Sequence, residues 1–527
     1  MAALAGGALP VVETSETAGA EGIGVTIAGT AASSRGTRPP SRAYAQAAPL
    51  GPGRQGMRGG RGAAAELSLL QQDITNITQG PGVQRAVWGI VVESIDRQER
   101  LFELNPRTLL VPASVAKLIP VATALDSAGW NFRYETTLET VGTITDGILH
   151  GDLFVVGSGD PSIGGRGGDD LTGWIDALVA LGVRQVEGRV IGDDNAQEEP
   201  RPAFSLAWDD LGTSGTLYGA LNLEENRMPV TVVAGNAPGE PAGLLVDAAG
   251  MSRALVGRAV TGERGSVASL WTEQRPGELA LTIAGTLPIG APPARMAVSV
   301  GNPTLWFARS LRYRLIAAGI PVAGEAYDID DLIVLPDRST KTVLHVHRSR
   351  PLSEIIQPLL KDSINIYGEA LLRLNGVGPA PTVDASVAGM AQTLTAWGIP
   401  AEGQQLVDGS GLSRRDVVAA DTLAMVLRRM FNADNTTPWM SGFPVAGVDG
   451  TLLTRMRRTA AEKNVRAKTG SMSNIRSLAG YVTTRDGERL AFVILLNNFE
   501  GPGTTALQAI DSIAVRLASF SRKCCAR

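Results

Sequence analysis

Three short motifs stand in order along this chain of 527 residues, and they constrain its fold more than any other feature. The motifs are Ser114-Val115-Ala116-Lys117, Ser363-Ile364-Asn365 and Lys468-Thr469-Gly470. They supply a hydroxyl with an amine one helical turn away, a hydroxyl–amide pair, and a cation expected on a strand. Acyl transfer through a serine without a histidine needs this set of groups. The fold must therefore bring three remote regions into one pocket.

Lysine is rare in this chain, and its positions support the same chemistry. Of 48 basic residues only six are lysine, yet Lys117, Lys361 and Lys468 all lie in or beside the motifs. Arginine keeps its proton in proteins, whereas a buried lysine can lose one. We therefore expect Lys117 to take the proton of Ser114, with Lys468 as a nearby cation that lowers the pKa of Lys117.

The other motif residues have roles that follow from their chemistry. A backbone N–H at the start of the Ser114 helix and the N–H of Ser471 would form an oxyanion hole. Ser363 is suited to relay a proton to the leaving amine, and Asn365 to hold a substrate amide. Lys468 and Thr469 would bind a terminal carboxylate.

Apolar spacing predicts the elements around the motifs. Between Lys117 and Ser363 lies a segment of short strands and glycine turns, too long for a loop, which must contain folded units of its own. The expected helices are 67–78, one opening at Pro112, 171–181, 304–318, 351–360, 366–374, 388–397, 420–431 and a last one around 507–517. The expected strands include 86–93, 99–104, 478–483 and 490–497.

Composition excludes several classes of function. The net charge is −4 with both signs interspersed, so no nucleic-acid partner is expected. The apolar run Leu490–Leu496 is too short to cross a bilayer, and we expect no transmembrane segment. The two cysteines, Cys524 and Cys525, are neighbours near the end of the chain, so no core disulfide is expected.

The first 63 residues are expected to be disordered or removed by processing, because Ala, Gly, Pro, Ser, Thr and Arg dominate them. A secretory signal has a basic start and then an apolar stretch. Residues 1–7 contain no basic residue, and no clear apolar stretch precedes the possible cleavage site Ala43-Tyr44-Ala45. The signal sequence is therefore not convincing.

No cofactor or metal is expected. His345 and His347 would face the same side of a strand, but no third ligand is apparent. The acidic pairs Asp193-Asp194 and Glu198-Glu199 are interpreted as solvated loop charges. The Gly-x-Ser-x-Gly motif of Ser-His-Asp hydrolases is absent from the sequence.

The ordered motifs resemble those of the penicillin-binding, serine-type D-alanyl-D-alanine peptidases. Further residues are similar to the low-molecular-mass class C group, the D-alanyl-D-alanine carboxypeptidase/endopeptidases. The resemblance covers about residues 80 to 515. The segments that carry it are Pro112–Leu118, Lys361–Asn365 with Glu369 and Leu371–Arg373 following, Asp408–Arg414, and Ala467–Ser471.

The resemblance implies a multidomain α+β fold. Its catalytic domain would be a penicillin-binding, serine β-lactamase-like transpeptidase domain, an antiparallel sheet flanked by helices. We expect this domain to comprise residues 64–140 and 345–521, after the N-terminal segment 1–63. The inserted segment would form two domains, one from 141–230 with 296–344 and the other from 231–295.

The resemblance also implies a function. The chain would be a D-Ala-D-Ala carboxypeptidase, with possible endopeptidase activity, that acts on peptidoglycan peptides in the periplasm or cell envelope. Its catalytic residues would be Ser114, Lys117, Ser363, Asn365 and Lys468, and β-lactams would be covalent inhibitors. Alternatives are a β-lactamase-type hydrolase and an inactive cell-wall binding protein.

The same resemblance assigns the substrate-binding residues. Thr469, Gly470 and Ser471 would line the cleft along the strand. Arg414 and Asp210 would bind the far end of the peptide side chain, where a guanidinium and a carboxylate suit meso-diaminopimelate. Ser473 stands where some relatives carry a longer polar residue.

Overall fold

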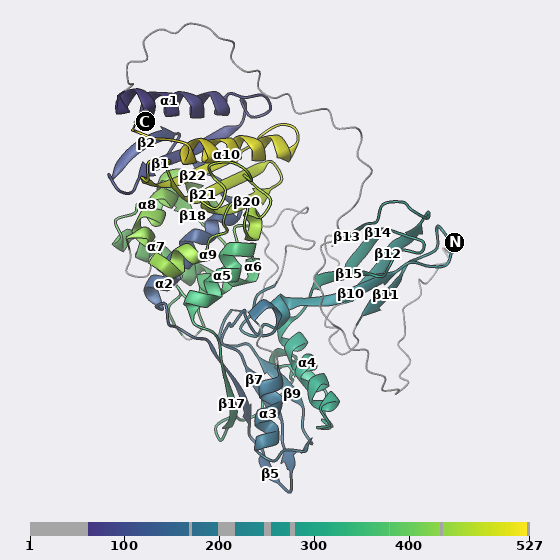
Figure 1. Ribbon diagram of the computed structural model, residues 1–527. Coiled ribbons are helices and arrows are strands. Elements are labelled where there is room, and N and C mark those ends of the chain that lie inside the picture. Colours follow the sequence, from purple (N-terminus) through teal and green to yellow (C-terminus); the bar gives the residue numbers. More distant parts are fainter. Residues whose placement is uncertain are drawn as a thin grey trace, which may run out of the picture. The chain divides into compact units, whose positions relative to one another are not determined.

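The computed structural model describes residues 62–167, 171–198, 217–246, 254–273, 280–378, 380–432 and 436–523 (Figure 1). All of them belong to one compact unit, Gly60–Arg527. The predicted N-terminal segment, apart from its last two residues, lies outside the described residues, as do Asp210, Glu199, Cys524 and Cys525. No helix among the described residues is long and apolar enough to cross a membrane.

A five-stranded antiparallel sheet brings the two ends of the described chain together. Its order is β2-β1-β22-β21-β20, and Val87 at the start of β1 pairs with Asn497 at the end of β22. The strands are β1 (Val87–Ser94), β2 (Glu99–Leu104), β20 (Arg466–Met472), β21 (Ile475–Thr483) and β22 (Arg489–Asn497).

Both faces of this sheet are covered. On one face α1 (Ala63–Thr78) and α10 (Gly503–Ala518) pack on Ile90 and Val92, and Figure 1 shows these two helices beside the sheet. On the other face Val91 joins a second core, to which several helices contribute. Alternate side chains of a strand point to opposite faces. Burial of both faces therefore explains why Leu490–Leu496 is almost continuously apolar.

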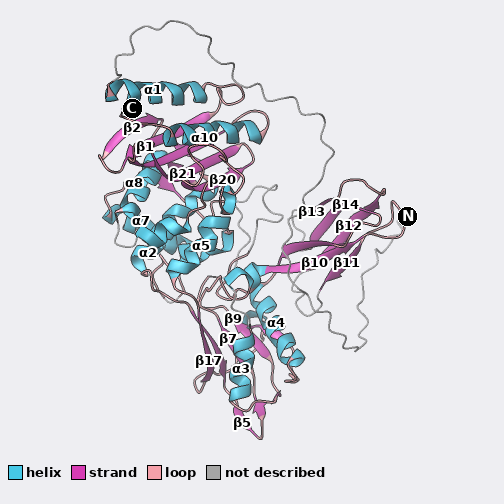
Figure 2. Cartoon of the chain, viewed as in Figure 1, coloured by secondary structure: helices cyan, strands magenta, loops and turns pink. Residues whose placement is uncertain are grey.

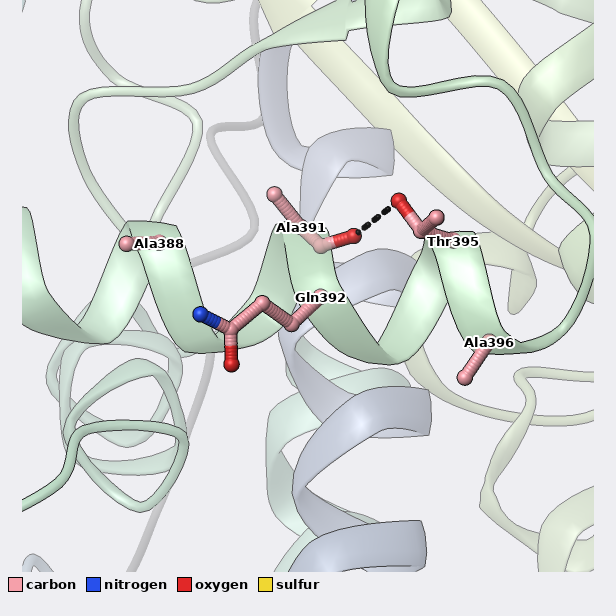
Figure 3. Close-up of a pocket in the computed structure, with 5 residues that line it drawn as sticks. All are labelled: Ala388, Ala391, Gln392, Thr395 and Ala396. Carbon is pink, nitrogen blue, oxygen red and sulfur yellow. Dashed lines mark hydrogen bonds between the residues drawn. The ribbon is translucent and has the colours of Figure 1, made fainter.

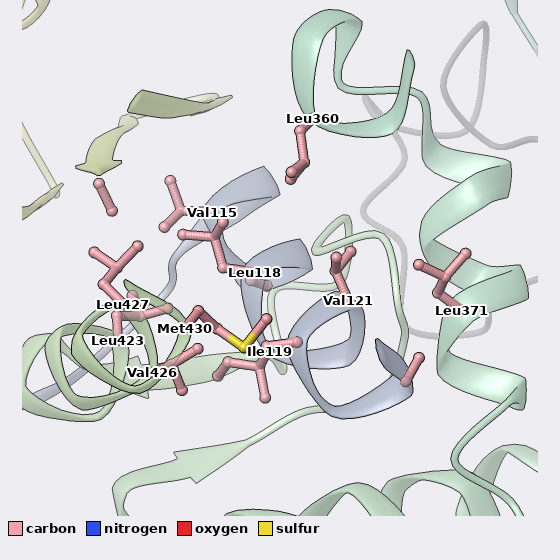
Figure 4. Close-up of a cluster of buried hydrophobic side chains, with 14 of the residues drawn as sticks. Val115, Leu118, Ile119, Val121, Leu360, Leu371, Leu423, Val426, Leu427 and Met430 are labelled. Carbon is pink, nitrogen blue, oxygen red and sulfur yellow. The ribbon is translucent and has the colours of Figure 1, made fainter. Parts of the chain in front are cut away.

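The helical core centres on α2 (Leu118–Ser127), which follows the first motif. Figure 4 shows Ile119 of α2 facing Val426 and Met430 of α8 (Ala420–Phe431), with Leu371 on another side. Full burial of each such side chain contributes about 1.5–3 kcal/mol, so this cluster holds the first motif rigidly. The other helices are α5 (Leu352–Asp362), α6 (Asn365–Arg373), α7 (Val383–Ala396) and α9 (Thr436–Gly442).

The segment between the first two motifs has its own sheets and its own core. Its largest sheet has the order β16-β9-β7-β4-β17, with β7 parallel to β9 and β9 parallel to β16. Figure 2 shows α3 (Thr172–Ala180) and α4 (Pro303–Ala317) beside these strands. The strands of this sheet are β4 (Glu135–Thr140), β7 (Leu153–Val156), β9 (Val190–Asp193), β16 (Ala326–Asp328) and β17 (Thr342–Arg348).

The described residues also form four three-stranded sheets. Three lie in the inserted segment. One contains β5 (Thr143–Thr145), β6 (Ile148–His150) and β8 (Gln185–Val186), a second β10 (Arg227–Val233), β11 (Gly243–Val246) and β15 (Ala294–Ser299), and a third β12 (Leu255–Gly262), β13 (Ser269–Glu273) and β14 (Leu281–Pro288). The fourth pairs β3 (Leu109–Leu110), next to the first motif, with β19 (Val417–Ala419) and β18 (Gln404–Gln405).

Candidate active site

The first motif lies in the first turn of the predicted helix, and this turn is a 3₁₀ helix. Ala113–Lys117 forms a 3₁₀ helix that leads directly into α2. With three residues per turn, residues 114 and 117 lie on the same edge, which brings their side chains together. Ala113 has a φ of 50°, a conformation that costs energy for a residue with a Cβ. The buried surroundings of this turn hold Ser114 in a fixed position.

Strand β20 approaches the back of this turn closely. A Cβ at position 470 would lie 2.7 Å from the Pro112 carbonyl oxygen, so Gly470 is what permits the approach. The Ser477 hydroxyl on β21 donates to the same carbonyl oxygen at 2.6 Å. The third motif is thus fixed beside the first by backbone contact.

Lys117 is fully buried and contacts both of the first two motifs. Its Nζ lies 2.8 Å from Ser114 Oγ and 2.8 Å from Asn365 Oδ1. A third partner is the Ser410 carbonyl oxygen at 2.5 Å. The amine is therefore positioned to exchange a proton with the Ser114 hydroxyl.

Ser363 and Lys468 form a second hydroxyl–amine pair. Lys468 Nζ lies 2.7 Å from Ser363 Oγ and 2.8 Å from the Thr469 carbonyl oxygen. Ser363 follows the last residue of α5, and its left-handed backbone (φ 64°) makes the turn between α5 and α6. The turn presents Ser363 to Lys468 and Asn365 to Lys117.

Burial lowers the pKa of both amines. The pKa of Lys117 falls to about 8, because burial outweighs the opposing charges of Asp408, Glu369 and Asp416. Burial also lowers the pKa of Lys468, and the charge of Lys117 adds to that shift. Repulsion between the two buried amines thus disfavours the state in which both are protonated.

Sequence reasoning missed the carboxylates behind Lys117. Asp408 and Glu369 stand in segments that carried the resemblance, but they received no role, and Asp416 was not considered. Burial and the charge of Asp408 raise the pKa values of Glu369 and Asp416. A carboxylate beside glycine and serine reads in sequence as an ordinary turn residue, so no signal revealed its position behind the base.

The predicted substrate-binding residues lie at one end of β20 where they are described. Thr469 Oγ1 donates to Thr451 Oγ1 at 2.9 Å, and exposed Ser471 pairs with Arg476 of β21. Arg414 reaches the Ser473 carbonyl oxygen, at 3.4 Å from Nη1 and 3.5 Å from Nη2. The structure therefore brings Arg414 and Ser473 together.

A surface hollow lies apart from the motifs. It is lined by residues of α7 alone, shown in Figure 3, and it contains no motif residue. The hydroxyl of Thr395 donates to the Ala391 carbonyl oxygen of the same helix at 2.9 Å. Gln392 is the other polar side chain among its lining residues, so the hollow has little capacity to bind a polar ligand.

The interpretation of Asp193 and Asp194 as solvated loop charges was wrong, because both side chains are buried. Asp194, Asp328 and Asp330 each place a carboxylate oxygen within 4.8 Å of the others. Thr304 donates to Asp194 at 2.5 Å, and Asn302 donates to Asp328 at 2.7 Å. Protein donors thus satisfy the buried carboxylates.

Known proteins have similar sequences and a similar fold. The chain is 35% identical over 471 residues to the D-alanyl-D-alanine carboxypeptidase of Actinomadura sp. (strain R39), which covers 87% of this chain and 86% of that protein. It is 26% identical over 419 residues to the D-alanyl-D-alanine carboxypeptidase DacB of Haemophilus influenzae, covering 78% and 85% of the two chains.

The crystal structure of penicillin binding protein 4 (dacB) from Haemophilus influenzae shows the same fold. It has a TM-score of 0.71 and 24% identity, and it covers 84% of this chain and 98% of its own. A complex of that protein with a β-lactam has a TM-score of 0.69 at 25% identity. Residues 70–519 match the D-Ala-D-Ala carboxypeptidase 3 (S13) family, and this range contains all three motifs. This chain therefore belongs to the D-Ala-D-Ala carboxypeptidase 3 (S13) family of serine peptidases.

Proposed function

We propose that this family member cleaves D-Ala-D-Ala termini of peptidoglycan peptides through an acyl-Ser114 intermediate. The observation that carries the proposal is the 2.8 Å contact between Lys117 Nζ and Ser114 Oγ. A serine hydroxyl becomes a nucleophile when an adjacent base removes its proton, and a pKa of about 8 leaves part of the Lys117 population unprotonated near neutral pH.

The reaction then follows from the positions of the groups. Ser114 Oγ attacks the carbonyl carbon of the penultimate residue while its proton passes to Lys117. Backbone N–H groups at Ser114 and Ser471 stabilise the oxyanion. The C–N bond breaks as the proton that Lys117 accepted passes through Ser363, which lies 2.7 Å from Lys468, to the leaving amine. Water then attacks the ester carbonyl carbon and gives up a proton to Lys117, and the C–O bond to Ser114 breaks as that proton returns to Ser114 Oγ.

The substrate carboxylate and side chain have separate binding groups. Lys468 and Thr469 bind the terminal carboxylate, while Gly470 and Ser471 line the cleft. Arg414, with Ser473 beside it and Asp210 as its acidic counterpart, binds the distal end of a diaminopimelate side chain. We expect Arg414→Ala to weaken hydrolysis of diaminopimelate-containing peptides and to leave penicillin acylation within about threefold of wild type. Equal loss of both activities would contradict this assignment.

An endopeptidase activity uses the same acyl donor. In a cross-bridge the leaving amine belongs to the side chain of a neighbouring peptide rather than to free D-alanine, so the steps at Ser114 are unchanged. Such a substrate places the protein in the periplasm or cell envelope, where β-lactams would reach Ser114 and acylate it.

A fluorescent penicillin tests the proposal. We expect stable labelling of the wild-type chain and no labelling of Ser114→Ala, measured by gel fluorescence on protein whose thermal unfolding is unchanged. Lys117→Arg should fold and remain unlabelled, because arginine keeps its proton. Rapid turnover of the penicillin would instead indicate a β-lactamase. A wild-type chain without label would indicate a binding protein.

A further inference from the structure

The third partner of Lys117 limits where the amine can direct its lone pair. A neutral lysine amine has two N–H bonds and one lone pair. Asn365 Oδ1 and the Ser410 carbonyl oxygen only accept hydrogen bonds, at 2.8 and 2.5 Å from Nζ. When these oxygens take both N–H bonds, the lone pair faces the Ser114 hydroxyl at 2.8 Å. The Ser410 carbonyl is therefore as important for orientation as the motif residue Asn365.

The Ser410 carbonyl belongs to a loop whose shape comes from Asp408. The Asp408 carboxylate accepts hydrogen bonds from the backbone N–H groups of Ser410 at 3.0 Å, Gly411 at 2.6 Å and Ser413 at 2.8 Å. Side-chain acceptors of this kind define a local turn. Asp408 thus explains the curvature of the loop, but not its placement beside Lys117.

Glu369 attaches this loop to α6. Its Oε1 accepts from the N–H groups of Gly409 at 3.1 Å and Ser410 at 3.0 Å. Glu369 lies one helical turn after Asn365, so one rigid helix carries both the Asn365 acceptor and the group that holds the N–H of Ser410, the residue whose carbonyl contacts Lys117. A Cβ at position 368 would lie 2.5 Å from the Gly409 carbonyl oxygen, so helix and loop are in backbone contact.

We propose that Glu369 is a positioning residue for the catalytic base: it fixes the Ser410 carbonyl relative to Asn365, so that the lone pair of Lys117 faces Ser114. This inference deepens the proposed function and rests on it. In this role Glu369 acts as a hydrogen-bond acceptor, and its charge, which opposes the fall in the pKa of Lys117, is a separate effect. Its other oxygen lies 3.9 Å from Arg373 Nη1, and the charged groups around Lys117 are Glu369, Asp408, Asp416 and Lys468.

Two substitutions separate the acceptor from the charge. Glu369→Gln keeps a carbonyl oxygen for the same two N–H groups, whereas Glu369→Ala removes it. Saturation kinetics of acylation by a fluorescent penicillin give the dissociation constant of the first complex and the acylation rate constant separately. Glu354→Ala is the matched control, because Glu354 lies on α5 with its side chain 56% exposed.

We expect Glu369→Ala to lower the acylation rate constant by about 10- to 100-fold, with the dissociation constant unchanged, because a misdirected base slows chemistry rather than binding. Glu369→Gln should stay within about threefold of wild type, as should Glu354→Ala. An alanine variant within threefold of wild type, or a glutamine variant as slow as the alanine variant, would overturn the inference.

Thermal unfolding shows whether each variant is folded. If Glu369→Ala lacks a cooperative transition, Glu369→Leu replaces it, since leucine fills the space without an acceptor. If neither folds, the glutamine variant decides alone: a rate constant within about threefold of wild type supports the inference, and a larger fall overturns it. A wild-type chain that the fluorescent penicillin does not label would instead contradict the proposed function, independently of the role of Glu369.

Discussion

At the scale of single residues, the site depends on amines that burial makes less basic. Lys117 and Lys468 are both fully buried, and each contacts a serine hydroxyl within 2.8 Å. The role of Lys117 as a base was predictable from the sequence, because lysine is rare in this chain and, unlike arginine, can release its proton when buried. The carboxylates that oppose the fall in the pKa of Lys117 were not predictable. Their burial near Lys117 depends on how a loop remote in sequence packs against it.

The pKa of Lys117 predicts how acylation depends on pH. A base must be unprotonated, so the second-order rate constant should rise about tenfold per pH unit below pH 8 and level off above it. His345 and His347 lie against Trp174, and His150 contacts Glu187, so these histidines lie outside the site. The rise in rate below pH 8 is therefore not expected to come from a histidine. Stopped-flow fluorescence with a penicillin from pH 6 to 9 measures it, and a flat profile would contradict Lys117 as the base.

At the scale of elements, periodicity located the structure well and local geometry poorly. The strand predicted at 99–104 has those bounds, and the predicted helix 420–431 is α8. The helix predicted to open at Pro112 is confirmed, but apolar spacing did not show that its first turn, Ala113–Lys117, is a 3₁₀ helix in close contact with Gly470 and Ser477. The parallel pairing of β7, β9 and β16 also escaped prediction, since apolar spacing does not report which strands are neighbours.

A substitution at Gly411 tests whether the loop that contains Ser410 must lie in close contact with the turn Ala113–Lys117. Gly411 has a φ of +74°, and a Cβ there would lie 2.2 Å from the Ala113 carbonyl oxygen. Gly398 has nearly the same φ, +75°, with nothing within 4 Å of the added atom. Alanine should therefore cost about 1 kcal/mol at Gly398, where only the backbone conformation is unfavourable.

At Gly411 alanine should cost more stability and should also slow acylation by at least about tenfold, because the turn before Ser114 must shift. Thermal unfolding and penicillin acylation of the two variants provide the comparison. Equal behaviour of Gly411→Ala and Gly398→Ala in both measurements would mean that the contact with Ala113 is unimportant.

At the scale of the whole molecule, the apolar cores suggest how the chain divides. The described core around the central sheet takes Tyr218 from the inserted segment, which otherwise has a separate cluster of its own. We propose the division stated above, with residues 64–140 and 345–521 as the catalytic domain. The chain crosses between the two parts in the pair β4–β17, where residues 135–140 and 345–348 fall within the catalytic bounds but join the sheet of the inserted segment. The cluster of that segment also includes Val230 and Ile283, so its two proposed domains share one core.

Separate cores predict that the protein unfolds in two steps, because two-state behaviour is a property of single cooperative domains. Calorimetry should resolve two transitions. A peptide boronic acid that forms a reversible adduct with Ser114 should raise only the transition of the catalytic part, by about 2.7 kcal/mol when its concentration is a hundred times its dissociation constant. Ser114→Ala should show both transitions without the shift. A single transition that moves as a whole would instead mean that the inserted segment and the catalytic part fold as one unit, despite the boundary between their cores.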